Sequence, residues 1–300
     1  MPGLLHNTAM RKLGQNRRMT TPNKWLCWSL VGILCIVSSL WSLSHRVRLV
    51  EDTRMETRDL VRQVPPQWTI LLTVNDGFYD FFQNWWAHYE QLNMTNAVVV
   101  VAEDDDVHAK LKTNSNITVE RPVLNITDAH KWRSEGYKAI VSTRAQHVLR
   151  HLIAGEDVLY TDVDTVWKSD PTVHLDLQTR DIVAQVDSSS YKGKSPYYCT
   201  GFMAIFSNAK TIQLMDRWNI ELTRKPQLNQ PLFHHLLHNQ TSLRHVGLSD
   251  ELFPSGQQYF VNMVSSNATQ RVVVVHNNYI QGHDAKKKRF QDFGLWHQHR

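Results

Sequence analysis

The sequence predicts an α/β protein, in which helices flank a mostly parallel central sheet and a single transmembrane helix precedes the folded domain. Short continuous apolar runs, typical of strands buried on both faces, alternate with stretches of helical periodicity. Near the N-terminus, residues 25–44 form an uncharged and mostly apolar run of 20 residues. The alternation predicts the sheet, and the long run predicts the membrane helix.

The run from Trp25 to Ser44 is long enough to cross a hydrocarbon core of roughly 30 Å as a helix. Five Lys or Arg residues precede it, whereas Arg46 and Arg48 closely follow it, so the positive-inside rule leaves the N-terminus in the cytoplasm. A cleaved signal peptide is the alternative, but no small-residue cleavage site follows the run. We therefore expect a cytoplasmic tail at 1–24, a signal anchor at 25–44 and type II topology.

The sequence pI of about 9.1 suggests an acidic partner, but the basic residues are unevenly placed. Seven of the 33 Lys and Arg residues lie in residues 1–48, which contain no Asp or Glu. The remaining chain has 26 basic against 28 acidic residues. No net positive field is left to bind a polyanion, and nucleic acid is excluded as a partner.

The sequons and cysteines indicate a secretory lumen. Five N-x-[S/T] sequons follow the predicted anchor, at Asn93, Asn116, Asn125, Asn239 and Asn267. Cys27 and Cys35 lie in the anchor, which leaves Cys199 without a lumenal disulfide partner. Residues 45–65, which end at Pro65-Pro66, are typical of a stem. The folded lumenal domain is then expected at 66–300.

Strand and helix patterns follow in order. The predicted strands are 68–74, 97–102, 157–160, 181–186, 202–206 and 271–275. A helix is predicted from Lys138 to Ile153, where apolar residues recur every three or four positions before Gly155 stops it. In open α/β sheets, ligands bind at the carboxyl ends of the strands.

Asp162 and Asp164 directly follow the predicted strand at 157–160. On an extended segment alternate residues project from one side, so the two carboxylates are expected to face together while Val163 turns inward. Two hard oxygen ligands suit Mn²⁺ or Mg²⁺. Such an ion bridges two phosphate oxygens of a nucleoside diphosphate and stabilises the negative charge of a leaving group.

A second D-x-D, from Asp104 to Asp106, shows that the motif alone is weak evidence. Carboxylates at this position fit the first turn of a helix, where unpaired amides and the helix dipole favour negative charge. A contact with a ribose is the alternative, because the motif also follows a strand.

His276 distinguishes the first motif from the second, because it ends the apolar run at 272–275 and imidazole is an acceptable Mn²⁺ ligand. Lys286, ten residues later, offers a compact positive charge for a diphosphate, and Gly282 lets backbone approach a ligand closely. The alternative for the basic run 286–289 is a solvated turn.

Four segments in order carry a resemblance to a known family. They are STRAQHVLRHLIAGEDVLYTDVDTVW (142–167), YYCTGFMAIFSN (197–208), NQPLFHH (229–235) and VHNNYIQGHDAKKKRF (275–290). Residues 68–296 resemble a family 77 glycosyltransferase, the nucleotide-diphospho-sugar transferase group that includes plant pectin xylosyltransferases. The resemblance implies a Rossmann-like GT-A domain that uses a UDP-sugar with Mn²⁺, and retention of the anomeric configuration.

The resemblance also implies roles for individual residues. Asp162, Asp164 and His276 are expected to hold the metal, Lys286 the diphosphate, Thr73 and Asn75 the base or ribose, Arg144 the nucleotide-sugar, and Gln230 or Asp187 the surroundings of the anomeric carbon. Retention implies that a departing phosphate oxygen takes the acceptor proton, so no strong protein base is required. One departure is Asn229, where the family usually has Asp before the Gln.

Two other groups of residues suggest a different chemistry, namely a zinc site and a cysteine nucleophile. His234 and His238 lie four apart on a predicted helix, but the general-base Glu of a zinc protease motif is missing, so packing or an acceptor-side role is favoured. Cys199 is a conceivable nucleophile, yet nothing adjacent in sequence would depress the pKa of its thiol. A partly buried thiol beside the acceptor pocket is favoured instead.

Together these features predict a single-pass type II glycosyltransferase of the Golgi membrane with a lumenal catalytic domain. It is expected to transfer a sugar, xylose or galactose by family resemblance, from a UDP-sugar to a glycan or glycoprotein acceptor. The alternative is a catalytically inactive GT-A-like lectin or scaffold. Intact Asp162, Asp164, His276 and Lys286 argue against that alternative.

Overall fold

The computed structural model describes residues 67–121, 130, 133–175, 180–188, 196–264 and 268–297. In this part of the chain no helix is both long and apolar enough to cross a membrane. The predicted tail, anchor and stem at 1–65 lie outside the described residues, as do Asn125 and Asn267 of the sequons.

A seven-stranded sheet forms the centre of the described chain, in the order β3-β2-β1-β4-β7-β6-β8. Its strands are β1 (Trp68–Val74), β2 (Ala97–Ala102), β3 (Thr118–Glu120), β4 (Asp157–Thr161), β6 (Ile182–Ser188), β7 (Tyr197–Ile205) and β8 (His245–Gly247). Strands β3, β2, β1 and β4 pair in parallel, whereas β7 runs antiparallel to β4 and β6. The predicted α/β class and mostly parallel sheet are therefore confirmed.

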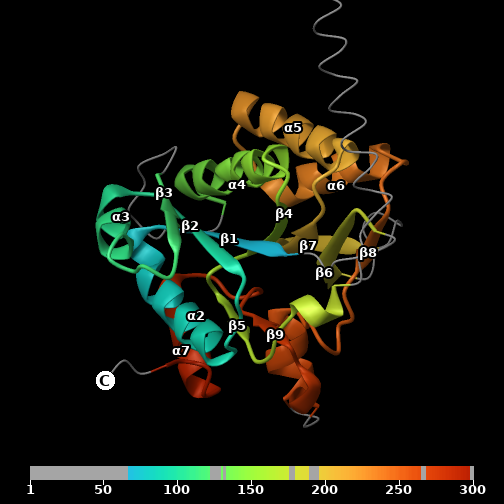
Figure 1. Cartoon of the computed structure of the whole chain (residues 1–300). Coiled ribbons are helices and arrows are strands. Elements are labelled where there is room, and N and C mark those ends of the chain that lie inside the picture. The colour runs from blue at the N-terminus through green and yellow to red at the C-terminus, as the bar shows by residue number, and fades with distance from the viewer. Residues whose placement is uncertain are drawn as a thin grey trace, which may run out of the picture. The chain divides into compact units, whose positions relative to one another are not determined.

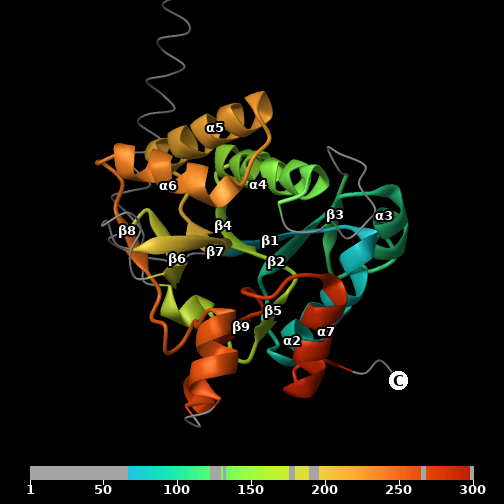
Figure 2. The ribbon, with the colours of Figure 1, turned by 180° about the vertical axis from the view of Figure 1, so that it is seen from behind.

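Helices cover both faces of this sheet. They are α2 (Tyr79–Gln91), α3 (Asp105–Leu111), α4 (Glu135–Ile153), α5 (Ala209–Arg224), α6 (Asn229–Asn239) and α7 (His283–Asp292), with short turns η1 (Asp76–Phe78), η2 (Thr172–His174), η3 (Gln258–Met263) and η4 (Thr269–Arg271). Helices α4, α5 and α6 lie on one face, and α2 and α7 lie on the other (Figures 1 and 2).

Helix α4 shows how local sequence sets these boundaries. It begins before the predicted Lys138 because the Ser134 hydroxyl accepts a hydrogen bond from the Tyr137 amide and caps the first turn. It ends where Gly155 adopts a φ of 83°, as predicted from the glycine. This helix carries Arg144 toward the carboxyl end of β4.

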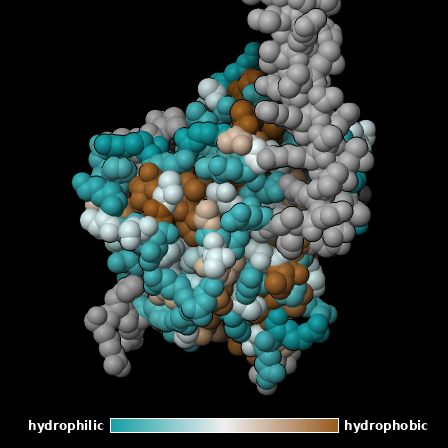
Figure 3. Space-filling model, viewed as in Figure 1, coloured by the Kyte–Doolittle hydropathy of each residue, from teal (hydrophilic) through white to brown (hydrophobic). Residues whose placement is uncertain are grey.

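Two hydrophobic clusters, one on each face of the sheet, form the core of the described chain. On the α2 face the rings of Trp85 and Trp167 meet edge to face with centroids 5.5 Å apart. On the α4 face Trp218 packs against Phe233 at 5.0 Å. The face shown in Figure 3 is largely hydrophilic with separate hydrophobic patches, as is usual for a domain with a buried core.

A second, two-stranded sheet pairs β5 (Thr165–Trp167) with β9 (Val274–His276) in antiparallel orientation. The strand predicted at 271–275 is therefore shorter and does not join the central sheet, because residues 269–271 form the turn η4. In this pairing Thr165 lies opposite His276. The small sheet thus brings a histidine from the end of the chain to the residues that follow β4.

The second D-x-D has the predicted structural role. Asp104 caps α3, because its carboxylate accepts hydrogen bonds from the amides of Val107 at 2.8 Å and Asp76 at 2.7 Å. We expect Asp104→Ala to lower the free energy of unfolding by about 1–2 kcal/mol, measured by urea denaturation. Asp106→Ala, which removes the other carboxylate, is the matched control and is expected to change stability little. Equal losses in both variants would contradict the capping role.

Candidate metal and nucleotide-sugar site

The residues after β4 form a turn that hydrogen bonds hold in place. The Asp162 amide donates to the Gly201 carbonyl at 2.8 Å, and the Asn277 amide donates to the Asp164 carbonyl at 2.9 Å. The Thr161 and Thr165 hydroxyls lie 2.9 Å apart and close the turn from within. The expected extended segment is therefore wrong in its backbone, although Val163 is buried as predicted.

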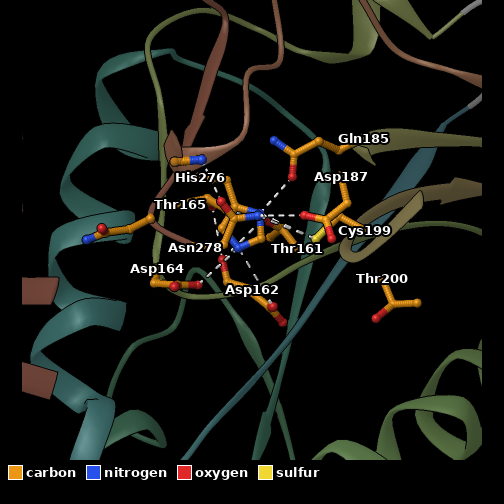
Figure 4. Close-up of polar contacts among 12 residues, drawn as sticks. Thr161, Asp162, Asp164, Thr165, Gln185, Asp187, Cys199, Thr200, His276 and Asn278 are labelled. Carbon is orange, nitrogen blue, oxygen red and sulfur yellow. Dashed lines mark hydrogen bonds and ion pairs between the residues drawn. The ribbon is translucent and has the colours of Figure 1, made fainter. Parts of the chain in front are cut away.

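The turn nevertheless brings the three predicted metal ligands together. One ligand atom each from Asp162, Asp164 and His276 lies within 4.8 Å of the others. His276 Nε2 is 3.5 Å from an Asp164 oxygen and 4.0 Å from an Asp162 oxygen. Figure 4 shows the two carboxylates on one side of the imidazole. The set, two carboxylates and one imidazole, suits Mn²⁺.

The charges of the cluster set the protonation of its ligands. Burial would raise the pKa of Asp164, but the charges of Lys286 and His276 outweigh it and hold that pKa well below its usual range. Burial would lower the pKa of His276, yet its interactions with Cys199 and Asp164 raise it well above its usual value. Asp164 is thus ionised at neutral pH and can act as a metal ligand. The residues present fit a divalent ion.

Lys286 lies at this cluster, at the start of α7. Its ammonium group forms an ion pair with Asp164 and donates to the Asn277 carbonyl at 2.9 Å. Gly282 immediately precedes the helix with a φ of +88°, and a Cβ there would meet no atom of the chain within 4 Å. The positive φ alone explains why glycine occupies this position, without any contact to a ligand.

Arg144 reaches Asp162 from α4. It is buried, donates to Asp162 at 2.6 Å and to the Thr200 carbonyl at 2.9 Å, and lies over the Tyr160 ring at 4.6 Å. Tyr160 in turn donates to Asp162 and lies 3.2 Å from the Thr73 hydroxyl. Thr73 and Arg144 are therefore connected to Asp162 through the same short network.

Asn75 directly follows β1, at the carboxyl end of the strand. Its side chain is buried, and its backbone carbonyl accepts from the Phe78 amide at 3.0 Å. This bond belongs to η1, the turn that leads into α2. A contact between Asn75 and the base or ribose of a bound nucleotide therefore stays a prediction.

Gln230 and Asp187 lie side by side, although their sequence positions are far apart. The Gln230 amide nitrogen donates to Asp187 at 2.9 Å, while its oxygen accepts from the Thr200 amide at 3.2 Å. Asn278 also donates to Asp187, at 3.4 Å. A neutral amide and a carboxylate thus face each other between β6, β7 and α6.

The departure at Asn229 has a structural explanation. Its side-chain nitrogen donates to the Val141 carbonyl at 3.1 Å, and its backbone carbonyl accepts from the Trp218 indole at 3.1 Å. A carboxylate has no hydrogen to donate to Val141. The amide therefore holds α6 against α4 in this chain.

Two residues at the site escaped the sequence predictions. A Cβ on Gly201 would lie 2.3 Å from an Asp162 oxygen and 2.7 Å from His276 Cε1, so only glycine fits there. Gln185, in β6, contacts His276 Nδ1 at 2.7 Å. A glycine inside a strand pattern and a single polar residue inside the apolar run 182–186 were the available signals.

The alternative chemistries receive no support from the geometry. His234 is buried, its Nε2 accepts from the Tyr198 amide at 2.7 Å, and burial lowers its pKa to about 4. Over the described ranges, the His234–His238 pair is not part of any three-residue cluster with metal-ligand spacing. Cys199 is more buried than expected, and its sulfur lies 3.7 Å from His276 Nδ1.

Residues 93–290 match the family model described as nucleotide-diphospho-sugar transferase. The chain belongs to this family. The family 77 resemblance and the glycosyltransferase class are thereby confirmed. The described topology, a mixed and mostly parallel sheet between helices, agrees with the α/β domain that the family resemblance implied.

Two relatives of this nucleotide-diphospho-sugar transferase have named activities. A UDP-D-xylose:L-fucose alpha-1,3-D-xylosyltransferase of Arabidopsis thaliana is 33% identical over 251 residues, which cover 76% of this chain and 66% of the relative. A UDP-galactose:fucoside alpha-3-galactosyltransferase of Dictyostelium discoideum is 27% identical, over 76% of this chain and 38% of the relative. The chain thus aligns with only part of each relative.

Among solved structures, the galactosyltransferase LgtC superposes with a TM-score of 0.45 at 13% identity, covering 69% of this chain and 86% of that one.

Proposed function

We propose that this nucleotide-diphospho-sugar transferase moves a sugar from a UDP-sugar to a glycan or glycoprotein acceptor, with Mn²⁺ or Mg²⁺ as cofactor. The observation that carries the proposal is the convergence of Asp162, Asp164 and His276, whose ligand atoms lie within 4.8 Å of one another. Lys286 contacts the same cluster. Three metal ligands with a lysine beside them, close to strand ends, are what a protein needs to bind a metal-bound nucleoside diphosphate.

Each residue then has a defined task. Asp162, Asp164 and His276 would hold the divalent ion, which when bound supplies Lewis-acid stabilisation of the leaving diphosphate. Lys286 would neutralise a further phosphate charge, and Arg144 would keep Asp162 oriented through its 2.6 Å hydrogen bond. Thr73 lies in β1 and Asn75 directly follows it, at the carboxyl end of the strand that neighbours β4, where the nucleoside would lie.

The acceptor side is assigned to Asp187 and Gln230. The 2.9 Å hydrogen bond from Gln230 to Asp187 would hold a neutral amide beside the anomeric carbon of the bound sugar. In a retaining reaction the acceptor attacks on the face of the leaving group, whose phosphate oxygen takes the acceptor proton. No strong protein base is needed, and the amide stabilises the developing positive charge of the sugar by its dipole.

A panel of UDP-sugars tests the proposed donor and the enzyme class together. The full chain is purified in detergent and incubated with UDP-xylose, UDP-galactose and UDP-glucose, and UDP release is measured with Mn²⁺ and with EDTA. The named activities of the relatives favour xylose or galactose. Release of UDP from one donor, only with metal, supports the proposal. Donor binding without release from any of them would support the inactive lectin or scaffold instead.

Lys286 and its neighbour Lys287 offer a matched pair. We expect Lys286→Met to lower kcat/KM for the UDP-sugar by about a hundredfold, because a charge on the diphosphate is lost in a water-poor site. Lys287 pairs with Asp80 at 2.8 Å and lies over Trp296 at 4.9 Å, away from the metal ligands. Lys287→Met is expected to retain most activity. Similar losses in both variants would point to the stability of α7 instead.

The proposed address is the Golgi membrane, with the tail at 1–24, anchor at 25–44, stem at 45–65 and catalytic domain at 66–300. Three sequon asparagines, Asn93, Asn116 and Asn239, are exposed among the described residues. In a lumenal domain we expect glycosidase digestion of the cell-expressed chain to increase its mobility on a gel, and a triple Asn→Gln variant to reduce that shift. An unchanged mobility of the digested wild-type chain would contradict the lumenal address.

A further inference from the structure

Gln185 lies at an irregularity in β6 that aims its side chain at the site. The register between β6 and β7 shifts between Ala184 and Val186, so Gln185 falls where the ladder is interrupted. Bulges of this kind redirect side chains and are common beside active sites. Gln185 is only 1% exposed, so each polar atom of its amide needs a partner inside the protein.

The two ends of this amide are distinguishable by their partners. One end lies 2.8 Å from the Pro254 carbonyl and 3.2 Å from the Phe253 carbonyl. Carbonyl oxygens only accept hydrogen bonds, so this end must be the amide nitrogen, which has two hydrogens to donate. The amide oxygen therefore faces the other way, toward His276.

The tautomer of His276 follows from that orientation. The Gln185 oxygen lies 2.7 Å from His276 Nδ1, and because this oxygen only accepts, Nδ1 must carry a hydrogen. Cys199 Sγ is a more distant contact at 3.7 Å. In the neutral imidazole, which is the form that binds a metal ion, the one hydrogen on Nδ1 leaves the lone pair on Nε2. Nε2 is the nitrogen that faces Asp162 and Asp164.

We infer that Gln185 is a positioning residue of the metal site, which holds His276 in the tautomer whose Nε2 is available to a divalent cation. The inference rests on the proposed function, because it assigns a task toward the metal that function requires. When a divalent cation displaces the hydrogen from Nε2, two carboxylates and the Nε2 lone pair converge on it. Figure 4 shows Gln185 and the carboxylates on opposite sides of the imidazole.

A purely structural role is the competing explanation, because the same amide ties β6 to the segment at 253–254. Two substitutions separate the roles. Gln185→Met has similar length and removes both the donor and the acceptor. Gln185→Glu also lacks the amide nitrogen but keeps an oxygen that accepts from Nδ1. A loss shared by both variants therefore reports the tie to 253–254, and a difference between them reports the acceptor.

The test measures Mn²⁺ binding directly. The full chain in detergent is titrated with MnCl₂, with UDP absent and then present, and free Mn²⁺ is quantified from its electron paramagnetic resonance signal. We expect Gln185→Met to weaken Mn²⁺ affinity by about 10- to 100-fold and Gln185→Glu to stay within about threefold of wild type. Equal weakening in both variants, or no change in Gln185→Met, would overturn the positioning role.

The hydrogen on His276 can also be located directly by NMR. If Gln185→Met does not fold, ¹⁵N resonances of the wild-type histidines are recorded at saturating Mg²⁺, with the His276 signals identified by their loss in His276→Gln. Hydrogen on Nδ1 alone is expected, and hydrogen on Nε2 would overturn the inference. If the wild-type chain binds no Mn²⁺ with or without UDP, the proposed function fails together with this inference. That outcome is distinct from a failure confined to the variants.

Discussion

Asp164→Asn is expected to lower the rate of sugar transfer by about a thousandfold, which corresponds to about 4 kcal/mol of transition-state stabilisation. The substitution replaces a buried ligand of full charge by a neutral amide of the same shape. It also removes the ion-pair partner of Lys286 and one of the two carboxylates that face His276. Steady-state rates with the best UDP-sugar at saturating Mn²⁺ measure the effect.

The control for Asp164→Asn is Asp106→Asn, which removes a carboxylate at the same position of the second D-x-D. We expect it to retain activity, because that motif serves the first turn of α3. Thermal unfolding of both variants verifies that each remains folded. An Asp164→Asn variant with near wild-type turnover would contradict the metal site, whatever the result for Asp106.

Gly201→Ala is the second large effect expected. An added Cβ would lie 2.3 Å from Asp162 Oδ2 and 2.7 Å from His276 Cε1, so both proposed metal ligands must move. Displacement of reacting or coordinating groups by about 1 Å costs about a hundredfold in rate. We therefore expect turnover to fall at least that far, together with a weaker affinity for Mn²⁺, measured by the same assays.

A double variant shows whether the effect of Gly201→Ala acts through the carboxylate. Asp162→Ala removes the nearest obstacle to the new methyl group. In the Asp162→Ala background, Gly201→Ala is expected to cost much less than in the wild-type chain, because groups in contact are not additive. A full additional loss in the double variant would mean that Gly201→Ala acts on the fold of β7 and not on the ligand.

The part of the fold that the sequence predicts best is the half built from parallel strands. The runs at 68–74 and 97–102 are apolar throughout because both faces of these strands are covered by helices, and the structure confirms their bounds. The strand predicted at 271–275 is found at 274–276, and it pairs with β5 in the small second sheet. An apolar run alone does not show which sheet a strand joins.

The candidate site divides in a similar way. Asp162, Asp164, His276, Lys286 and Arg144 were predicted, because charged residues at strand ends and a family resemblance mark them. Gln185 and Gly201 were not, because their roles depend on contacts between strands that are remote in sequence. Gly201 matters through the space beside Asp162, and Gln185 matters through which atom faces His276. Such distances exist only in the folded chain.

The most direct test of the proposed metal-dependent nucleotide site is a calorimetric titration of UDP into the full-length chain in detergent, with Mn²⁺ and with EDTA. The site described here predicts saturable binding of one UDP per chain with Mn²⁺, and binding weakened by at least tenfold when EDTA replaces the metal. Equal UDP affinity with Mn²⁺ and with EDTA would contradict the assignment of Asp162, Asp164 and His276 as ligands of a nucleotide-bound metal ion.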